Sequence, residues 1–404
     1  MTNGLVIIGG GQAASSAAAK IRELDATIPI TIFGGERALP YQRPPLSKAY
    51  LAGEITMERL IFRPEQWFDE NAVELKTGTF VDAIDRAGKT VTLDDGTVVP
   101  YGKLLLATGS RPRKLPRQMT GDLEGIFYLR TARDADRMRT HLQPGHRMAV
   151  IGGGYIGLEV AAMASKLGLE VVVIEAAERI LQRVASPSTS DFFRTLHHSH
   201  GVQILENASV AEIKGEDGKV NSLQLGDERT LPVDLILVGI GVEPQTGLAE
   251  DAGLDLQNGI WTDEFCATSD ENIFAAGDCA SFNFGGEVTR LESVPNAIHQ
   301  GETAAANMLG QSVVYEAEPW FWSDQYDVKL QIAGLNRGYD DTIVRPGKRE
   351  GAQSVWYYKG EQLIAVDAMN DAPSFMLARK ILQAGKTVPK EVVADADTNL
   401  REWA

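Results

Sequence analysis

The stretch Met148–Glu159, M-A-V-I-G-G-G-Y-I-G-L-E, decides how the rest of this chain is interpreted. Its first four residues form an apolar run of the kind that fills a buried parallel strand. Gly152, Gly154 and Gly157 then give G-x-G-x-x-G in front of an apolar helical pattern. In such a turn the first glycine permits the bend, the second lets the backbone approach a pyrophosphate, and the third lets helix and strand pack closely. The stretch therefore predicts a dinucleotide-binding βαβ unit.

A carboxylate stands where this kind of unit requires one. A second apolar strand is predicted over 170–174, and Glu175 follows it, eighteen residues after Gly157. A carboxylate there accepts hydrogen bonds from the 2′- and 3′-hydroxyls of an adenosine ribose, which favours NADH. The alternative, an accidental glycine turn, does not explain this acid. The residues expected to bind NADH are Gly152, Gly154, Tyr155, Ile156, Gly157, Glu159, Glu175, Arg183 and Gly241.

The composition is that of an ordinary globular protein with two or three domains. The chain has 404 residues, of which 44% are hydrophobic and 23% charged. Its 55 acidic and 39 basic residues give a net charge of −16, which argues against nucleic-acid binding. Two cysteines, Cys266 and Cys279, are too few for a disulfide framework or a four-thiolate site, so no metal is expected. No signal peptide or membrane span is recognised, and a cytoplasmic location is expected.

The N-terminus carries a second phosphate-binding turn. A strand is predicted over Leu5–Ile8, and the residues that follow it, 9–14, read G-G-G-Q-A-A, which is G-x-G-x-x-A. A helix over 13–24 and a strand over 29–33 complete the unit. Glu36, just beyond that strand, is a candidate ribose ligand, although Gly35 occupies the place where an acid is expected. Two such turns in one chain are far less expected by chance than one.

Three further segments are candidates for ligand contacts. Pro40–Lys48 is a proline-rich stretch predicted as an extended loop with two cations; an exposed basic loop is the alternative. A strand over 273–275 ends in Gly277-Asp278, at the carboxyl edge of a sheet where α/β folds bind ligands. For Asp278 alone, a turn or helix cap is the alternative. A helix predicted over 297–309 presents its N-terminus, which favours an electron-rich group.

The pattern predicts an α/β fold with two Rossmann-like domains, one inserted into the other, and a C-terminal α+β domain. The first domain is expected over 1–110 and 234–318, and the inserted NADH-binding domain over 111–233. The C-terminal domain is expected over 319–404 and opens with an aromatic cluster, for which a role in the core is the alternative.

Several motifs together resemble a known family. The two turns, A-T-G at 107–109 and T-x-x-x-x-I-F-A-x-G-D at 268–278 resemble the two-dinucleotide flavoprotein reductases of the glutathione-reductase superfamily. Within it, the chain is similar to the ferredoxin reductases that serve bacterial oxygenases, of the putidaredoxin reductase type. The motifs that carry this closer similarity are P-P-L-S-K at 44–48, E-S-V-P-N-A at 292–297 and P-W-F-W-S-D-Q at 319–325.

The resemblance implies cofactors and roles. It implies non-covalent FAD in the first turn, NADH in the second, and the C-terminal domain behind the flavin. Lys48 and Glu159 are implied to meet as an ion pair near flavin N5, and Trp320 and Trp322 to lie near the flavin and the docking surface. These four are expected as catalytic. The residues expected to bind FAD are Gly9, Gly11, Ala13, Ala14, Gly35, Glu36, Arg43, Lys48, Val81, Ala107, Thr108, Gly109, Arg130, Asp278, Val294 and Ala297.

One absence selects the subclass. Disulfide reductases of this superfamily carry C-x-x-x-x-C after the first βαβ unit, whereas residues 40–51 contain no cysteine. Electrons are therefore expected to leave the flavin directly. The expected activity is that of an NADH:ferredoxin oxidoreductase: hydride passes from nicotinamide C4 to flavin N5, and single electrons pass to a [2Fe–2S] ferredoxin. The ferredoxin would supply a cytochrome P450 or a Rieske oxygenase, and the protein is expected as a monomer or weak dimer without nucleic-acid or membrane partners.

Two other functions remain open on the sequence. One is NADH-dependent reduction of rubredoxin or a small acceptor such as a quinone, on the same fold and site. The other is an NADH-sensing scaffold like apoptosis-inducing factor, which does not need fast turnover. If a ferredoxin is the acceptor, the cations expected to offer it a local basic surface are Arg63, Arg290, Lys329 and Arg337.

Overall fold

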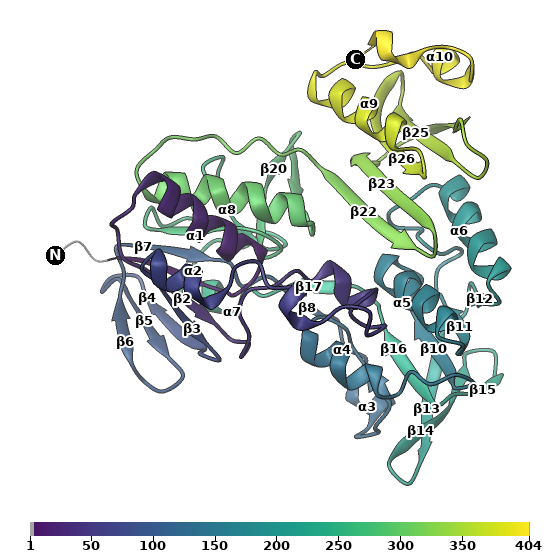
Figure 1. The fold of residues 1–404 in the computed structure, drawn as a ribbon, viewed down its shortest axis with the longest axis horizontal. Helices are drawn as coiled ribbons and strands as arrows, with labels where there is room; N and C mark the ends of the chain where they lie inside the picture. The colour runs from purple at the N-terminus through teal and green to yellow at the C-terminus, as the bar shows by residue number, and fades with distance from the viewer. Residues whose placement is uncertain (1–3, 404) are drawn as a thin grey trace. The chain divides into compact units, whose positions relative to one another are not determined.

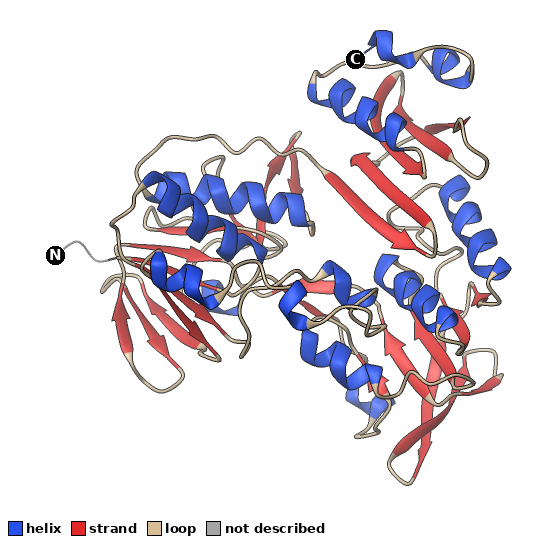
Figure 2. Ribbon diagram, in the orientation of Figure 1, coloured by secondary structure: helices blue, strands red, loops and turns tan. Residues whose placement is uncertain are grey.

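The structure is a computed structural model that describes residues 4–403 (Figures 1 and 2). The chain divides into two compact units, each built from several stretches of sequence. The first unit comprises Met1–Gln42, Met57–Arg111 and Val242–Pro319, and the second comprises Arg43–Thr56, Pro112–Gly241 and Trp320–Ala404. No helix within residues 4–403 is long and apolar enough to cross a membrane.

The first unit is organised around a five-stranded parallel sheet with the order β19-β7-β1-β2-β3. Strand β1 pairs with β2 and then β3 on one side, and with β7 and then β19 on the other. The strand order therefore reverses at β1, and its carboxyl end is the switch point where such sheets bind ligands. Two helices, α1 (Gln12–Leu24) and α8 (Val294–Met308), lie side by side in this unit (Figure 1). The strands are β1 (Leu5–Ile8), β2 (Ile30–Gly34), β3 (Val73–Thr77), β7 (Lys103–Leu106) and β19 (Ile273–Ala275).

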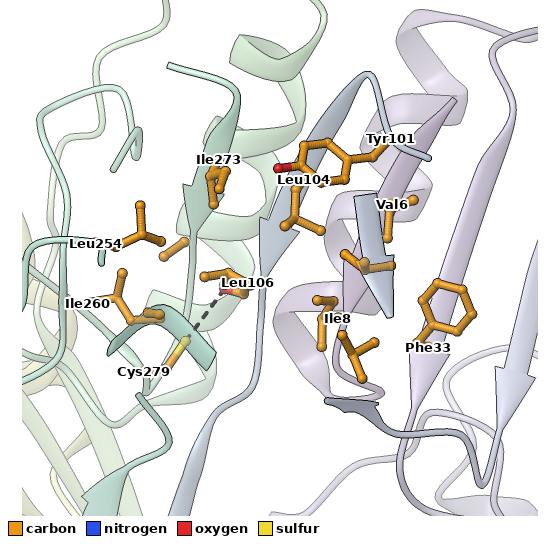
Figure 3. Close-up of a cluster of buried hydrophobic side chains, with 14 of the residues drawn as sticks. Val6, Ile8, Phe33, Tyr101, Leu104, Leu106, Leu254, Ile260, Ile273 and Cys279 are labelled. Atoms are coloured by element: carbon orange, nitrogen blue, oxygen red, sulfur yellow. Dashed lines mark hydrogen bonds between the residues drawn. The ribbon is translucent and has the colours of Figure 1, made fainter. Parts of the chain in front are cut away.

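The core of the first unit lies against one face of this sheet (Figure 3). Val6 and Ile8 of β1 point to the same face because side chains alternate along a strand, and Leu104 and Leu106 of β7 join them. The strands are also covered on their other face, which is why they read as continuous apolar runs rather than alternating ones. Cys279 closes this core, and its thiol donates a hydrogen bond to the carbonyl oxygen of Leu106 at 3.5 Å.

Smaller elements surround this sheet in the first unit. A hairpin turns at Asp95-Gly96, and β4 to β6 form an antiparallel sheet. The remaining elements are η2 (Met57–Arg59), α2 (Glu65–Glu70), β4 (Val81–Asp85), β5 (Thr90–Leu93), β6 (Val98–Pro100), β8 (Ser110–Pro112), β17 (Val242–Pro244), α7 (Gly247–Asp251), β18 (Ile260–Trp261), β20 (Ala280–Phe284) and β21 (Glu287–Thr289).

The second unit contains another five-stranded parallel sheet, with the order β12-β11-β10-β16-β9. Helix α5 follows directly on β10, as the G-x-G-x-x-G turn predicts. The unit also contains a three-stranded antiparallel sheet, β13 to β15. These elements are η1 (Pro44–Ser47), α3 (Arg117–Thr120), β9 (Ile126–Phe127), α4 (Ala132–Arg139), β10 (Arg147–Ile151), α5 (Tyr155–Lys166), β11 (Glu170–Ile174), α6 (Pro187–Ser199), β12 (Gln203–Leu205), β13 (Val210–Glu216), β14 (Lys219–Leu225), β15 (Thr230–Pro232) and β16 (Leu235–Val238).

The second unit also contains a five-stranded antiparallel sheet with the order β22-β23-β26-β25-β24. Helix α9 packs on β23 and β26 over a core that includes Trp356 and Phe375. The elements are β22 (Trp320–Gln325), β23 (Val328–Gly334), β24 (Asp341–Pro346), β25 (Gln353–Lys359), β26 (Gln362–Met369), α9 (Ala372–Gln383), α10 (Lys390–Ala394) and η3 (Leu400–Trp403).

Some local expectations are wrong. Residues 44–47 form a short 3₁₀-helix rather than an extended loop, because proline is well tolerated in a first helical turn. Helix α8 begins at Val294 instead of Ala297, since Ser293 caps it and Pro295 occupies its first turn. Helix α4 begins with a capping box formed by Thr131 and Asp134.

Candidate cofactor and electron-transfer site

The second glycine turn has the shape of a phosphate cradle. Gly152 has φ +105°, and a Cβ built on it would lie 2.4 Å from the carbonyl oxygen of Gly239. A Cβ on Gly157 would lie 2.2 Å from the carbonyl oxygen of Gly152, so the first and third glycines are required by packing. Around Gly154, no described residue other than its neighbours in the chain lies within 4 Å of such a Cβ, and no side chain there caps α5. This open, uncapped helix start fits a pyrophosphate.

Glu175 is fixed against this turn. Its Oε2 accepts a hydrogen bond from the backbone N–H of Gly153 at 2.7 Å, and its Oε1 accepts one from Ala177 at 2.8 Å. Both donors are main-chain groups, so the position of the carboxylate is set by the backbone. Each oxygen keeps a second lone pair, which leaves the group able to accept hydroxyl donors.

The other predicted NADH residues lie in two places. Arg183 is beside Gly241, with its Nη2 3.6 Å from a Cβ built on that glycine. Ile156 is exposed at the start of α5. The hydroxyl of Tyr155 is buried without a hydrogen-bond partner among residues 4–403, its ring lies 4.9 Å from that of Phe321, and burial raises its pKa. Tyr155 thus packs against strand β22 rather than in the open space of the turn.

The first glycine turn repeats this geometry in the first unit. Gly9 has φ +131°, and a Cβ built on it would lie 2.1 Å from the carbonyl oxygen of Ala107. At Gly11, by contrast, no described residue other than its neighbours in the chain lies within 4 Å of such a Cβ, and α1 has no side-chain cap. Helix α8 approaches α1 so closely that a Cβ on Gly301 would lie 2.5 Å from the carbonyl oxygen of Ala13, and Ala14 is fully buried behind it. This turn also fits a pyrophosphate.

The ribose position of the first unit departs from the expected pattern. A Cβ built on Gly35 would lie 2.6 Å from the ring of Phe80, whose side chain is 58% exposed. An aspartate at position 35 would therefore require that ring to move. The adjacent acid, Glu36, accepts a hydrogen bond from the hydroxyl of Tyr41 at 2.5 Å. A carboxylate is thus present near the end of β2, one residue later than the family pattern places it.

Asp278 lies at the carboxyl edge of the parallel sheet, as expected for a residue that follows β19. Its Oδ2 accepts a hydrogen bond from the hydroxyl of Ser110 at 2.8 Å. The preceding Gly277 has φ +81°, and its N–H donates to the side chain of Gln300 on α8 at 2.8 Å. Helix α8 thereby fixes the loop that carries Asp278.

The remaining predicted FAD residues fall in both units. Thr108 donates a hydrogen bond to the carbonyl oxygen of Gln245 at 2.6 Å, and Gly109 has φ +73° in the same turn. In the second unit, Arg43 donates to the carbonyl oxygen of Arg130 at 2.8 Å. Val81 begins β4 and belongs to the core, whereas Val294 and Ala297 lie in the first turn of α8.

Lys48 and Glu159 form the ion pair that the resemblance implied. The ammonium nitrogen of Lys48 lies 2.6 Å from Glu159 Oε2, and the Glu159 side chain is only 6% exposed. Two serines complete the shell: Ser47 donates to Oε2, and Ser323 donates to Oε1 at 2.7 Å. A buried carboxylate needs such partners because water no longer solvates it. Both serines stand inside motifs that were recognised in the sequence, but their spacing gave no reason to assign them to Glu159.

Trp320 and Trp322 lie on the same face of strand β22, with ring centroids 5.5 Å apart. The guanidinium of Arg379 lies 5.2 Å from the centre of the Trp320 ring, and Phe375 packs against the same ring at 5.9 Å. Both tryptophans are half-buried, so the pair is neither fully in the core nor fully in solvent.

Neither cysteine is suited to carry electrons. Cys266 and Cys279 are free thiols, fully buried in the first unit, and burial raises the pKa of each. Reactive thiols need an accessible, electropositive setting, which these lack. Within residues 4–403 no cluster of histidine, cysteine and carboxylate side chains has the arrangement of a metal site.

For one of the four cations, Arg290, the expected role in a docking surface is wrong. The side chain of Arg290 is only 9% exposed, pairs with Glu292, and donates to the carbonyl oxygens of Asn258 and Asp278. It is part of the loop structure rather than of a docking surface. Arg63 is also partly engaged, since it donates to Ser15 at 2.9 Å, whereas Lys329 is exposed.

Comparison with known proteins identifies relatives along the whole chain. It is 42% identical to rhodocoxin reductase of Rhodococcus erythropolis over 399 residues, covering 98% of this chain and 93% of that one. It is 40% identical to putidaredoxin reductase CamA of Pseudomonas putida over 404 residues, covering 98% and 96%. A rubredoxin-NAD(+) reductase of the same organism is 38% identical over 368 residues, covering 91% and 95%.

Two solved structures have nearly the same fold. The reductase in the covalent putidaredoxin reductase–putidaredoxin complex matches with a TM-score of 0.96 and 39% identity, covering 99% of this chain and 98% of that one. The ferredoxin reductase for the CYP199A2 system of Rhodopseudomonas palustris matches with a TM-score of 0.95 and 40% identity, covering 99% of both chains. The predicted fold class and the family resemblance are therefore confirmed.

Family matches cover nearly all of the sequence. Residues 3–301 match the family described as pyridine nucleotide-disulphide oxidoreductase, and residues 320–404 match the one described as reductase C-terminal. These oxidoreductases depend on FAD and NAD(H), which fits the two open glycine turns. The chain belongs to the pyridine nucleotide-disulphide oxidoreductase family and carries the reductase C-terminal domain.

Proposed function

We propose that this protein is an NADH:ferredoxin oxidoreductase that delivers electrons one at a time to a [2Fe–2S] ferredoxin, which supplies a cytochrome P450 or a Rieske oxygenase. The observation that carries this proposal is the full-length similarity to a reductase whose structure was solved in covalent complex with putidaredoxin. The burial of both cysteines supports it, because a buried thiol is a poor electron carrier.

The chain's own residues bind and orient the cofactors. We assign FAD to residues 1–110 and 234–318, NADH to 111–233, and the acceptor side to 319–404. FAD, when bound, supplies the exchange between two-electron and one-electron chemistry. The open helix starts at Gly11 and Gly154 hold the two pyrophosphates, and Glu175 accepts the ribose hydroxyls of NADH.

Lys48 and Glu159 are assigned to the reactive edge of the flavin, as the resemblance implies. Glu159 holds the Lys48 ammonium at 2.6 Å, so that a fixed positive charge serves the place where negative charge develops. Trp320 and Trp322 are assigned to the side from which electrons leave. We further propose a cytoplasmic protein, monomeric or weakly dimeric, that binds neither nucleic acid nor membrane.

The decisive experiment is turnover of the purified holoprotein with NADH and a panel of acceptors. A [2Fe–2S] ferredoxin from an oxygenase system should be reduced with a much higher kcat/KM than a rubredoxin. The similarity to a rubredoxin-NAD(+) reductase makes rubredoxin the second candidate, and the reverse order would favour it. Slow flavin reduction by NADH, together with dimerisation on adding NADH, would favour a sensing scaffold instead.

A further inference from the structure

The Glu159 carboxylate ends a longer chain of hydrogen bonds inside the second unit. Ser323, which donates to Glu159 Oε1 at 2.7 Å, itself accepts a hydrogen bond from Gln325 Nε2 at 3.2 Å. Gln325 Oε1 lies 2.8 Å from Nε2 of His197, and the hydroxyl of Tyr326 lies 3.4 Å from Nδ1 of the same ring. The chain therefore runs from Tyr326 to Glu159 through three side chains.

These three linking side chains are completely buried. Ser323, Gln325 and His197 each have an exposed fraction of 0%. A polar group left unpaired in such surroundings is destabilising, because no water replaces the lost partner. The three come from two elements that are distant in sequence, since His197 belongs to α6 and the other two to β22.

The donors of this chain all point toward Glu159. The Ser323 hydroxyl has one proton, which it gives to the carboxylate, so it must accept from the Gln325 amide. The amide oxygen then accepts from His197 Nε2–H, which leaves Nδ1 to accept from Tyr326. A neutral imidazole has this pattern, and burial lowers the pKa of His197 to about 4, which keeps it neutral. Because the amide has no mobile proton at neutral pH, the chain supports a charge rather than conducting protons.

Strand β22 separates two tasks on its two faces. Alternate residues share a face, so Phe321, Ser323 and Gln325 point one way while Trp320 and Trp322 point the other. The face that carries Phe321, Ser323 and Gln325 packs against α5, the helix after the second glycine turn. There the ring of Tyr155 lies 4.9 Å from that of Phe321. The same strand thus presents the tryptophan pair and fixes the carboxylate of Glu159.

We infer that Ser323, Gln325 and His197 are positioning residues for the reaction: they fix the rotamer and negative charge of Glu159, and through it the place of the Lys48 ammonium. None of the three is proposed to touch a cofactor or substrate. The inference rests on the proposed function, because it assigns the Lys48–Glu159 pair to hydride transfer. It goes beyond that function in naming the residues that hold the pair.

The test compares Ser323→Ala, Gln325→Leu and the conservative Ser323→Thr with the wild-type holoprotein. The readouts are the limiting rate of flavin bleaching by excess NADH, the NADH concentration giving half that rate, and the visible spectrum of bound FAD. Ser323→Ala removes a hydrogen bond to the charged Glu159 and should lower the limiting rate about tenfold. Gln325→Leu removes the hydrogen bond that holds the Ser323 hydroxyl and should also lower the rate, by a smaller factor. The half-saturating NADH concentration should change less than twofold, and Ser323→Thr should keep most of the rate.

Ser354→Ala is the matched control. Ser354 is a fully buried serine of the same antiparallel sheet, and it accepts a hydrogen bond from Trp356 Nε1 at 3.0 Å without a bond to Glu159. It should lose stability but keep the wild-type rate. A wild-type rate in folded, FAD-bound Ser323→Ala would overturn the inference, and so would an equal loss of rate in Ser354→Ala.

The measurements distinguish a failure of the proposed function from a failure of this inference. Flavin bleaching is measured without any ferredoxin, so a wild type that is bleached by NADH but reduces no ferredoxin contradicts only the proposed acceptor. If NADH does not bleach the wild-type flavin, crystal structures of wild type and Ser323→Ala decide the inference. The Lys48–Glu159 pair at 2.6 Å should then be present in the first and broken or displaced in the second; an unchanged pair would refute the inference.

Discussion

The carboxylate of Glu175 accepts a hydrogen bond from the backbone N–H of Gly153, the central residue of the second glycine turn, at 2.7 Å. The charge that is proposed to select the dinucleotide is therefore attached to the loop that is proposed to hold its pyrophosphate. A 2′-phosphate about 4 Å from this carboxylate would be repelled by up to roughly 4 kcal/mol at an effective dielectric of 20. This corresponds to at most about a thousandfold preference for NADH.

Glu175→Ala should lower this preference to less than about tenfold, because it removes the repulsion and the ribose contact together. The measurement is kcat/KM for NADH and for NADPH with a small-molecule acceptor. Glu170→Ala is the control, since Glu170 is an exposed acid at the opposite end of the same strand. Equal values for the two dinucleotides in the wild type would contradict the assignment of Glu175.

Lys48→Ala should slow flavin reduction while FAD stays bound. The change leaves Glu159, 6% exposed, with only its serine donors and no compensating charge. Breaking one partner of a buried pair typically costs about 3–5 kcal/mol of stability. The double variant Lys48→Met/Glu159→Gln should regain much of that stability without regaining the rate. Urea unfolding and stopped-flow bleaching separate the two effects, and an unchanged bleaching rate in Lys48→Ala would place Lys48 outside the reactive site.

The glycines of the second turn should respond differently to alanine. Gly154→Ala meets open space within the described chain, so it should fold normally but raise the KM for NADH at least tenfold by filling the place of the pyrophosphate. Gly157→Ala brings a Cβ to 2.2 Å from a carbonyl oxygen and should lower stability by several kcal/mol. Gly247→Ala, also unobstructed, is the control for both measurements. A wild-type KM for NADH in Gly154→Ala would exclude this turn as the binding site.

The apolar runs and the glycine motifs of the sequence were enough to predict the parallel strands and the turns that follow them. The parallel strands are continuous apolar runs, and the strand predicted over Ile273–Ala275 is observed with those bounds. Both glycine turns were recognised because a positive φ and a close backbone approach leave a signature in the sequence itself. The strand at Trp320–Gln325 was not assigned, although its aromatic residues favour an extended chain.

The partners of the site residues could not be predicted in the same way. Ser47 and Ser323 lie 112 and 164 residues from Glu159, and no periodicity relates positions so far apart. The absence of an acid at Gly35 was visible in the sequence, but not its physical counterpart, the Phe80 ring that fills the space of a Cβ there. Only the tertiary structure brings such residues together.

Asp367 is a buried acid that the proposed mechanism does not use. It has an exposed fraction of 0%, and its Oδ2 accepts hydrogen bonds from the hydroxyls of Tyr357 and Thr189. Its Oδ1 has no hydrogen-bond partner among residues 4–403, and neither has the buried hydroxyl of Tyr155. Burial raises the pKa of Asp367 to about 6, although both hydroxyl donors oppose the shift. The folded protein therefore binds a proton here more tightly than the unfolded chain.

Because the pKa of Asp367 is raised in the folded protein, this residue makes the protein less stable as the pH rises. The contribution of Asp367 is fully present below about pH 4, where the acid is protonated in both states, and is lost as pH rises through 6. Asp367→Asn removes the titration, so the wild type should lose roughly 2.5 kcal/mol relative to the variant between pH 4 and pH 7. Urea unfolding of both proteins across this range gives the difference at each pH, with Asp327→Asn, at an exposed acid, as the control that should keep the wild-type slope. A difference between wild type and Asp367→Asn that stays constant with pH would show that Asp367 is ionised in the folded protein throughout the range.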